Sequence, residues 1–200
     1  MKTIVITGID GSGKSTQTKL LKQSLNNAET YSVWDLIVHP DYRDWSIYQF
    51  PPPVEKYVIN LNPVARTLFI FHAFDFAYEQ ALKSQADYVI FDAYWYKYLA
   101  VELAMGTDKN LIEFAKNRYL KPDFCFYLDM QIDELHNRKP KISAYESGLK
   151  DHLDYDNFIK IQKSAKTYLE GFLPENSLTI SATKPIDEIH QIIMQNIDTQ

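Results

Sequence analysis

Apolar residues gather in five short runs along this chain, and the runs are rich in residues that favour β-strands. Each run is apolar nearly throughout instead of alternating with polar residues, which is the pattern of strands covered on both faces. We therefore expect strands at the following ranges: Thr3–Thr7, Thr30–Asp35, Tyr88–Asp92, Phe124–Asp129 and Ser177–Ser181.

Helical patterns fill the intervals between these runs. Apolar spacing of about 3.6 residues is clear in Asp151–Phe172 and in Ile186–Ile197. Asn62 is a suitable N-cap, and Pro63 follows it in the first turn of a long segment that ends at about Ser84. Shorter helices are expected at Lys14–Leu25, Leu111–Tyr119 and Ile132–Asn137.

The alternation of strands and helices predicts an α/β fold, with a parallel sheet wrapped by helices on both faces. Ligands of such sheets bind at the carboxyl ends of the strands. Gly8, Asp92 and Asp129 lie at three of these ends, so they are candidate site residues. The irregular stretch Val38–Asn60 is expected to be a long functional loop over the sheet rather than a domain boundary.

The segment Gly8–Ser15 fits the pattern Gly-x4-Gly-Lys-Ser/Thr, directly after a predicted strand and before a predicted helix. Its glycines let successive main-chain amides turn inward around an oxyanion, and the positive end of the following helix adds to that field. In such a loop Lys14 reaches the β- and γ-phosphates of a nucleoside triphosphate, and the Ser15 hydroxyl binds magnesium. The alternative is a tight turn with a surface lysine, which the motif and its context together disfavour.

The formal charge of −5 comes from 21 Lys and Arg against 26 Asp and Glu. This balance disfavours nucleic acid as a partner, although it suits a small anionic ligand held by a few local groups. No apolar run approaches the roughly 20 residues that cross a bilayer, and the opening segment lacks the pattern of a signal peptide, so no membrane partner is expected. The only cysteine, Cys125, cannot form an internal disulfide, so we expect a cytoplasmic location.

The motifs together resemble one family. Gly8–Gln17 (GIDGSGKSTQ) is similar to the opening of thymidylate kinases, in which an acidic residue sits inside the loop. Four further segments resemble family landmarks and fall in the expected order: Tyr88–Tyr94 (YVIFDAY), Lys121–Asp129 (KPDFCFYLD), Arg138–Glu146 (RKPKISAYE) and Ser181–Ile189 (SATKPIDEI). The resemblance covers the whole chain, strongly in the first segment and moderately elsewhere.

This resemblance implies a doubly wound five-stranded sheet of the P-loop nucleoside triphosphate hydrolase type. It implies one domain over residues 1–200, with a lid at about 137–149. It further implies ATP and Mg²⁺ as cofactors, transfer of the ATP γ-phosphoryl group to a nucleoside monophosphate, typically dTMP, and a homodimer.

Two carboxylates carry over by position. Asp10 matches the loop acid that the family places near the acceptor sugar, and a helix cap is its plain alternative. Asp92 matches the strand-end aspartate placed near magnesium and the reacting phosphates, and an ordinary strand end is its alternative. The magnesium ligands implied are Ser15 and Asp92. The donor nucleotide is expected at Gly8, Asp10, Gly11, Ser12, Gly13, Lys14, Ser15, Thr16 and Ala182.

Gly11 replaces the basic residue that some family members carry inside the loop. Members that have a glycine at this position take their catalytic cation from the lid, and the lid of this chain contains Arg138, Lys139 and Lys141. The alternative is that these three residues form a solvated basic patch. The catalytic residues implied are Lys14, Asp92, Arg138 and Lys141.

Three arginines of the family pattern are absent. Ala93 replaces the arginine after the strand-end aspartate, no arginine occurs from Thr67 to Asn117, and Ala144 replaces the lid arginine. Such arginines usually neutralise the charge that builds up in phosphoryl transfer.

Other residues are therefore expected to hold the acceptor. Asp10, Arg43 and Arg66 are expected to orient it, with His72 near the missing helix arginine and Tyr94 as a ring that stacks on a pyrimidine; the acceptor set is Asp10, Arg43, Arg66, His72 and Tyr94. Lys97, five residues beyond Asp92, is within reach of the same place, although an ammonium does not reproduce the fork of a guanidinium.

Three interpretations follow. The first is a thymidylate kinase-like enzyme. The second is a kinase for an uncharged acceptor, such as a nucleoside or another hydroxyl compound, because such an acceptor needs no arginine clamp. The third is a nucleotide-binding relative that has lost the transfer chemistry.

Overall fold

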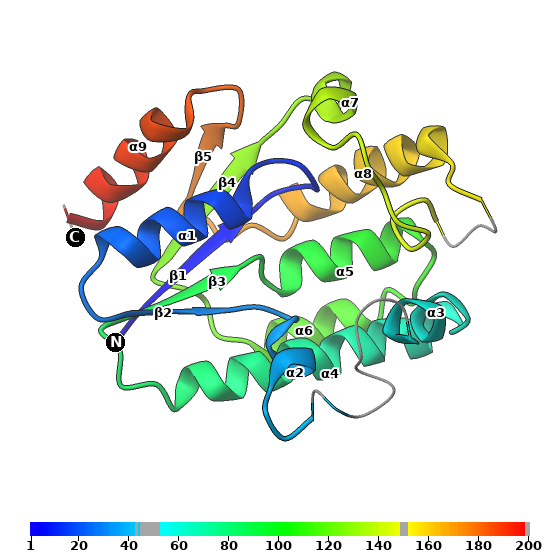
Figure 1. The fold of residues 1–200 in the computed structure, drawn as a ribbon, viewed down its shortest axis with the longest axis horizontal. Helices are drawn as coiled ribbons and strands as arrows, with labels where there is room; N and C mark the ends of the chain where they lie inside the picture. Colours follow the sequence, from blue (N-terminus) through cyan, green and yellow to red (C-terminus); the bar gives the residue numbers. More distant parts are fainter. Residues whose placement is uncertain (43, 45–52, 149–151, 199–200) are drawn as a thin grey trace.

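The computed structural model describes residues 1–42, 44, 53–148 and 152–198. Within these ranges five parallel strands form one sheet, in the order β2-β3-β1-β4-β5 (Figure 1). The strands are β1 (Lys2–Thr7), β2 (Ala28–Tyr31), β3 (Tyr88–Asp92), β4 (Phe124–Asp129) and β5 (Ser177–Ser181). The helices are α1 (Lys14–Ser24), α2 (Asp35–Val38), α3 (Pro53–Ile59), α4 (Pro63–Leu82), α5 (Trp95–Ala104), α6 (Leu111–Arg118), the 3-10 turn η1 (Ile132–Glu134), α7 (Leu135–Arg138), α8 (Tyr155–Glu170) and α9 (Ile186–Asp198).

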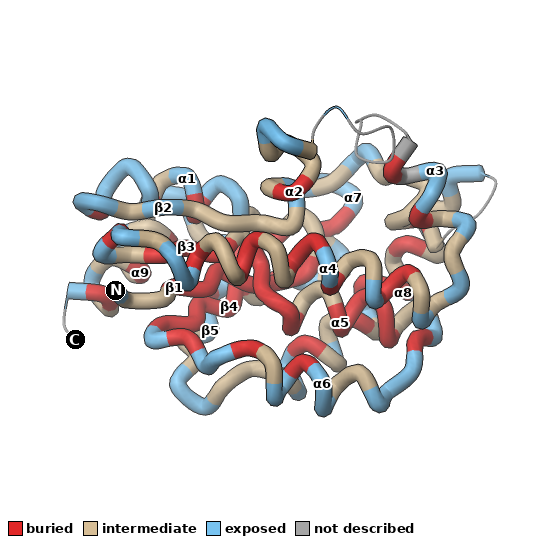
Figure 2. The backbone as a smooth tube through the Cα atoms, turned by 90° about the horizontal axis from the view of Figure 1, so that it is seen from below, coloured by how far each residue is buried: buried red, intermediate tan, exposed pale blue. Residues whose placement is uncertain are grey.

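Helices cover both faces of the sheet, as β1 shows most directly. Val5 packs in one hydrophobic cluster with Phe74 of α4, whereas the next residue, Ile6, packs in another cluster with Leu21 of α1 and Ile193 of α9. Successive side chains of a strand point to opposite faces, so the sheet is buried on both sides. Figure 2 shows the buried residues concentrated along the strands and the helices that cover them. The expected doubly wound α/β fold is confirmed.

The second strand differs from its prediction. β2 ends at Tyr31, and Asp35, the expected last residue of the strand, opens helix α2 instead. Ser32 explains the turn: its N–H donates to Asp35 Oδ2 over 2.8 Å, and its hydroxyl donates to Asp35 Oδ1 over 3.2 Å. A carboxylate that binds the backbone in this way favours a turn over a strand. The other four strands lie within one residue of their predicted bounds.

Helix starts follow their caps. α4 begins as predicted, because Asn62 Oδ1 accepts a hydrogen bond from the N–H of Ala65 over 2.9 Å. α8 begins later than predicted, at Tyr155, because the Asp154 carboxylate accepts from the N–H of Asn157 over 2.8 Å. The predicted helix Ile132–Asn137 is confirmed only in its second half, by α7, because the 3-10 turn η1 takes up its first three residues.

Helix α5 was not predicted, because its opening residues Trp95, Tyr96 and Tyr98 favour strands. In the structure Trp95 and Tyr96 are buried, and α5 packs along α8 (Figure 1). The expected loop Val38–Asn60 contains helix α3, and residues 43 and 45–52 of it lie outside the described ranges. None of the helices in those ranges is both long and apolar enough to cross a membrane.

Candidate active site

The loop between β1 and α1 lies at the carboxyl edge of the sheet, where Ile6 of β1 pairs with Asp92 of β3. Gly8, Gly11 and Gly13 all have positive φ, at 154°, 79° and 95°. A Cβ on Gly8 would lie 2.6 Å from Ser12 Oγ and 2.7 Å from the carbonyl oxygen of Leu128, so a side chain does not fit there. These backbone conformations give the loop the close turn that an anion-binding ring of amides needs.

Two polar features of this loop are left for a ligand. Gly13, the N-cap residue of α1, has no side chain to cap the first amides of the helix, and those amides carry the positive end of the helix dipole. The Ser12 hydroxyl is buried and has no hydrogen-bond partner among the described residues. Buried polar groups normally find partners, so both features fit a bound phosphate.

Lys14 lies across the loop, where its Nζ donates to the carbonyl oxygen of Ile9 over 2.8 Å. Burial lowers the pKa of Lys14 to about 8, although the Asp10 carboxylate acts in the opposite direction. The ammonium therefore lies against the main chain of the loop, within reach of a phosphate bound there.

Asp10 is held from two helices. Lys97 of α5 places its Nζ 3.0 Å from Asp10 Oδ1, and Gln162 of α8 donates to Asp10 Oδ2 over 3.0 Å. Gln162 Oε1 also accepts from the N–H of Asp10 over 3.0 Å. Burial alone would raise the pKa of the Asp10 carboxyl, but Lys97 and Lys14 outweigh it and hold that pKa well below its usual range. Asp10 is therefore ionised, and its carboxylate is not the cap of α1.

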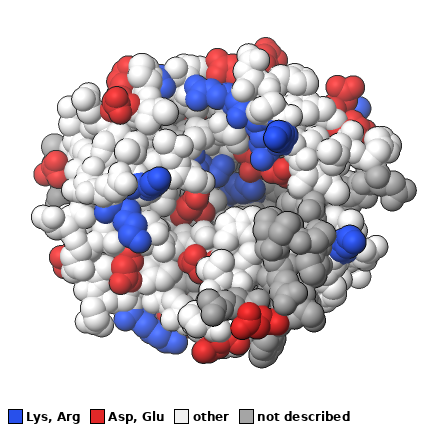
Figure 3. Space-filling model, viewed as in Figure 1, with Lys and Arg blue, Asp and Glu red and all other residues white. Residues whose placement is uncertain are grey.

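Ser15 and Asp92 line one hollow of about 230 Å³ with Asp35. Figure 3 shows acidic and basic side chains close together around the hollowed centre of the face drawn there. A hydroxyl and two carboxylates are oxygen donors of the kind that Mg²⁺ prefers, and Mg²⁺ takes its other ligands from phosphates and water. The chemistry of these donors therefore fits a magnesium ion, although within the described ranges no three His, Cys, Asp or Glu converge as a metal site of their own.

The start of the lid lies against the phosphate loop. A Cβ on Gly11 would come within 3.4 Å of Lys139 Cβ and 3.5 Å of Arg138 Cβ. Arg138 Nη2 donates to the carbonyl oxygen of Ala182 over 2.7 Å, which joins the start of the lid to a residue expected to bind the donor nucleotide. Arg138 is thus more than part of a solvated patch.

Lys139, rather than Lys141, is the lid lysine whose charge reaches the loop. It acts on the pKa values of both Asp10 and Lys14, and it forms an ion pair with Glu146 over 2.8 Å. Lys141 is exposed, so its catalytic role stays a prediction.

The structure contradicts the expected acceptor contact of Arg66. This side chain is 1% exposed, and its Nε donates to both oxygens of Glu102 over 2.8 and 3.1 Å. Glu102 is fully buried and also accepts from the hydroxyl of the lid residue Tyr145 over 2.7 Å. The Arg66 guanidinium is therefore neutralised by Glu102 inside the protein, although its buried Nη2 has no hydrogen-bond partner among the described residues.

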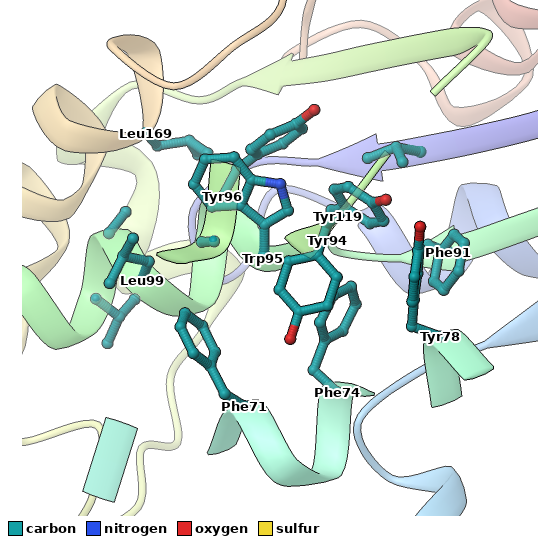
Figure 4. Close-up of a cluster of buried hydrophobic side chains, with 14 of the residues drawn as sticks. Phe71, Phe74, Tyr78, Phe91, Tyr94, Trp95, Tyr96, Leu99, Tyr119 and Leu169 are labelled. Atoms are coloured by element: carbon teal, nitrogen blue, oxygen red, sulfur yellow. The ribbon is translucent and has the colours of Figure 1, made fainter. Parts of the chain in front are cut away.

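Tyr94 is also not an acceptor contact. Its side chain is 0% exposed, its hydroxyl donates to Leu120 O over 2.9 Å, and Figure 4 shows its ring among Phe74, Phe91 and Tyr96. A buried ring of this kind has no free face to stack on a base.

The other predicted positions are less decisive. His72 is exposed on α4 beside Phe69, and its role stays a prediction. Arg43 lies outside the described residues. Asp129, the third strand end, forms an ion pair with Lys166 of α8 and so belongs to the packing of β4 on α8.

Sequence reasoning missed three residues of this site. Gln162 and Glu102 carried no signal, because each acts on a partner more than 30 residues away. Asp35 did carry a sequence signal, because it is a carboxylate at the end of a predicted strand, as Asp92 is.

Comparison with known proteins agrees with this geometry. The family model described as thymidylate kinase matches residues 58–193. The chain belongs to the thymidylate kinase family. Among the relatives of this family member, the probable thymidylate kinase of Methanocaldococcus jannaschii is 30% identical over 96% of this chain and 93% of its own. The thymidylate kinase of Plasmodium falciparum is 28% identical over 98% of this chain and 89% of its own.

Solved structures confirm the fold of this thymidylate kinase family member. Thymidylate kinase from Candida albicans matches with a TM-score of 0.69 and 21% identity, over 99% of this chain and 91% of its own. Deoxyadenosine kinase from M. mycoides matches with a TM-score of 0.69 and 17% identity, over 99% of this chain and 100% of its own. The fold is thus the P-loop nucleoside triphosphate hydrolase type, and the chain is an enzyme, a phosphotransferase.

Proposed function

We propose that this enzyme transfers the γ-phosphoryl group of ATP to dTMP, giving dTDP and ADP. The observation that carries the proposal is the glycine loop around Lys14, which this family member couples to an ionised Asp10 at the acceptor side. The family and its curated relatives favour a nucleoside monophosphate as the acceptor.

The chain supplies positioning and charge for a direct, in-line transfer without a covalent enzyme intermediate. The loop amides and Lys14 hold the triphosphate, and Arg138 of the lid stands over it, beside Ala182. Ser15 and Asp92 would hold the Mg²⁺ of the nucleotide, which neutralises charge on the phosphates. Asp10 accepts from a hydroxyl of the acceptor sugar.

A nucleoside acceptor is the second candidate, because of where the described arginines lie. Arg66 is paired with Glu102, and Arg118 of α6 is paired with Asp75 and Glu79, so neither is available as a clamp for the acceptor phosphate. The fold shared with a deoxyadenosine kinase is compatible with this candidate but does not favour it over the family's acceptor.

Release of ADP in a coupled assay, with dTMP, thymidine and deoxyadenosine as acceptors, tests the proposal. We expect turnover with dTMP to exceed that with either nucleoside by at least an order of magnitude, because nucleosides leave the phosphate-binding groups unpaired. Turnover with a nucleoside alone would establish the second candidate, and MgATP binding without turnover would establish a decayed enzyme.

Two variants show whether activity comes from this site. Lys14→Ala removes the ammonium inside the loop and should abolish MgATP binding. Lys121→Ala is the matched control, because Lys121 is exposed and precedes β4, at the opposite edge of the sheet. Unchanged ATP affinity in Lys14→Ala would contradict the site assignment.

Three further expectations rest on the same proposal. The chain works as one domain, and a homodimer is expected by family resemblance; sedimentation of the purified protein measures its mass. A cytoplasmic location suits the single cysteine, Cys125, which is buried and unpaired.

A further inference from the structure

The acceptor side of this site lacks its expected arginines, yet it contains a buried cation. Ala93 stands in the left-handed region, with φ 68°, and its N–H donates to the carbonyl oxygen of Ile6 over 2.9 Å. This sharp turn starts α5 immediately beyond the end of β3. Lys97, in the first turn of α5, is thereby carried back over the phosphate loop.

Lys97 is mostly buried and lies against a carboxylate, unlike an ordinary surface lysine. Its side chain is 15% exposed, as is that of Asp10, and their charged groups lie 3.0 Å apart. Asp92 and the lid residue Glu146 also act on its charge. Lysines are rarely buried without a purpose, because their charge is costly to remove from water.

The Lys97 ammonium has more N–H donors than Asp10 accepts. An ammonium carries three N–H donors, and Asp10 also receives a hydrogen bond from Gln162, so Asp10 is not short of partners. A ligand group that approached the ion pair of Lys97 and Asp10 would meet the remaining donors of Lys97. A phosphate monoester has the oxygens to accept them, whereas a nucleoside hydroxyl at that place does not carry the matching charge.

We propose that Lys97 binds the phosphate group of the acceptor, in the place of the arginine that Ala93 replaces, and so selects a nucleoside monophosphate over a nucleoside. This inference rests on the proposed function and specifies how the site chooses its acceptor. It also explains how the enzyme keeps a charged acceptor although Arg66 is committed to Glu102.

Calorimetric binding of dTMP, thymidine and MgATP to Lys97→Met, Lys97→Arg and wild type tests the inference. Loss of one charge-assisted hydrogen-bonding group should weaken dTMP binding in Lys97→Met by roughly 10- to 100-fold. Binding of thymidine and MgATP should change by less than about threefold, since neither places a group on Lys97. Lys97→Arg should keep the preference for dTMP. Lys109→Met, an exposed lysine beyond the other end of α5, is the matched control.

A structural role would give a different result. If Lys97 only neutralised Asp10, dTMP and thymidine would lose affinity together, and Asp10→Asn would restore dTMP binding in the Lys97→Met background. We expect no such restoration. The Asp10→Asn, Lys97→Met double variant also removes the uncompensated buried charge, so it keeps the test open if the single variant fails to fold.

The outcome is separable from that of the proposed function. The inference is supported if wild type binds dTMP more tightly than thymidine and Lys97→Met loses this preference. That result would hold even without turnover, because absent turnover contradicts only the proposed function. Turnover of dTMP with equal dTMP affinity in wild type and Lys97→Met overturns the inference and leaves the proposed function standing.

Discussion

The buried pair of Arg66 and Glu102 gives a quantitative prediction about stability. Both side chains are at most 1% exposed, and Arg66 Nε bridges the two oxygens of Glu102. In Glu102→Leu the guanidinium would stay buried, with only a 3.5 Å contact to Leu61 O. Breaking a buried ion pair from one side costs about 3–5 kcal/mol, because a charge remains without a partner in a medium of low dielectric constant.

The Tyr145 hydroxyl would lose its acceptor in the same variant, which adds about 1 kcal/mol. The sum is a large part of the 5–15 kcal/mol that typically separates folded from unfolded states. With a urea dependence of about 2 kcal/mol per molar, the midpoint of unfolding should fall by about 2–3 M.

The double variant Arg66→Met, Glu102→Leu separates charge from packing. Replacing both partners by apolar residues of similar volume is often neutral or stabilising, so the midpoint should return to within about 0.5 M of wild type. Glu102→Gln keeps hydrogen-bonding atoms without the charge, so its urea midpoint should lie between those of Glu102→Leu and the double variant. Urea unfolding followed by circular dichroism measures all three. A Glu102→Leu midpoint within about 0.5 M of wild type, or a double variant as unstable as the single one, would refute the reasoning.

Three further predictions concern the phosphate loop. Burial lowers the pKa of Lys14 in the free protein to about 8, and bound phosphates raise that pKa again. MgATP affinity should therefore fall from pH 8 to 9.5, and binding in this range should take up a proton. Calorimetry in buffers of different ionisation enthalpy measures the proton uptake, and binding without proton exchange at pH 8.5 would contradict the prediction. Gly8→Ala should abolish MgATP binding, because its Cβ would lie 2.7 Å from the main-chain oxygen of Leu128; Gly106→Ala, whose Cβ meets no atom within 4 Å, is the control for positive φ alone, and equal effects in both would oppose the steric reasoning. Gln162→Leu should cost about 1–3 kcal/mol of unfolding free energy, since it leaves the Asp10 carboxylate and N–H without their α8 partner; an unchanged urea midpoint would show that water replaces the amide.

Local sequence signals predicted the parts of the structure that depend on neighbouring residues. The phosphate loop is one such part, because glycine spacing, Lys14 and the flanking strand and helix lie within about 25 residues. The start of α4 is another, since Asn62 caps a residue three positions away. Strands β1, β3 and β4 were predicted because burial on both faces leaves a nearly uninterrupted apolar run.

The acceptor side could not be predicted in the same way. Asp10 meets Gln162 across 152 residues, and Arg66 meets Glu102 across 36, so their partnership appears only when the helices pack. Tyr94 was misassigned for a related reason: an aromatic residue after a strand-end aspartate has the same sequence whether its ring stacks on a ligand or fills the core.

Helix α5 connects these long-range contacts. Its first turn carries Lys97 against Asp10, and five residues later it carries Glu102 against Arg66 and the lid residue Tyr145. Each residue of a helix is rotated by about 100° from the one before it, so a shift of one position would take Lys97 off the loop and Glu102 off both partners. A buried ion pair is weak evidence for stability, because apolar residues serve that purpose as well. The ion pair of Arg66 and Glu102 instead fixes the rotation of α5 about its own axis. Only one rotation lets Glu102 bind Arg66 and Tyr145 together, and that rotation points the Lys97 ammonium at the phosphate loop.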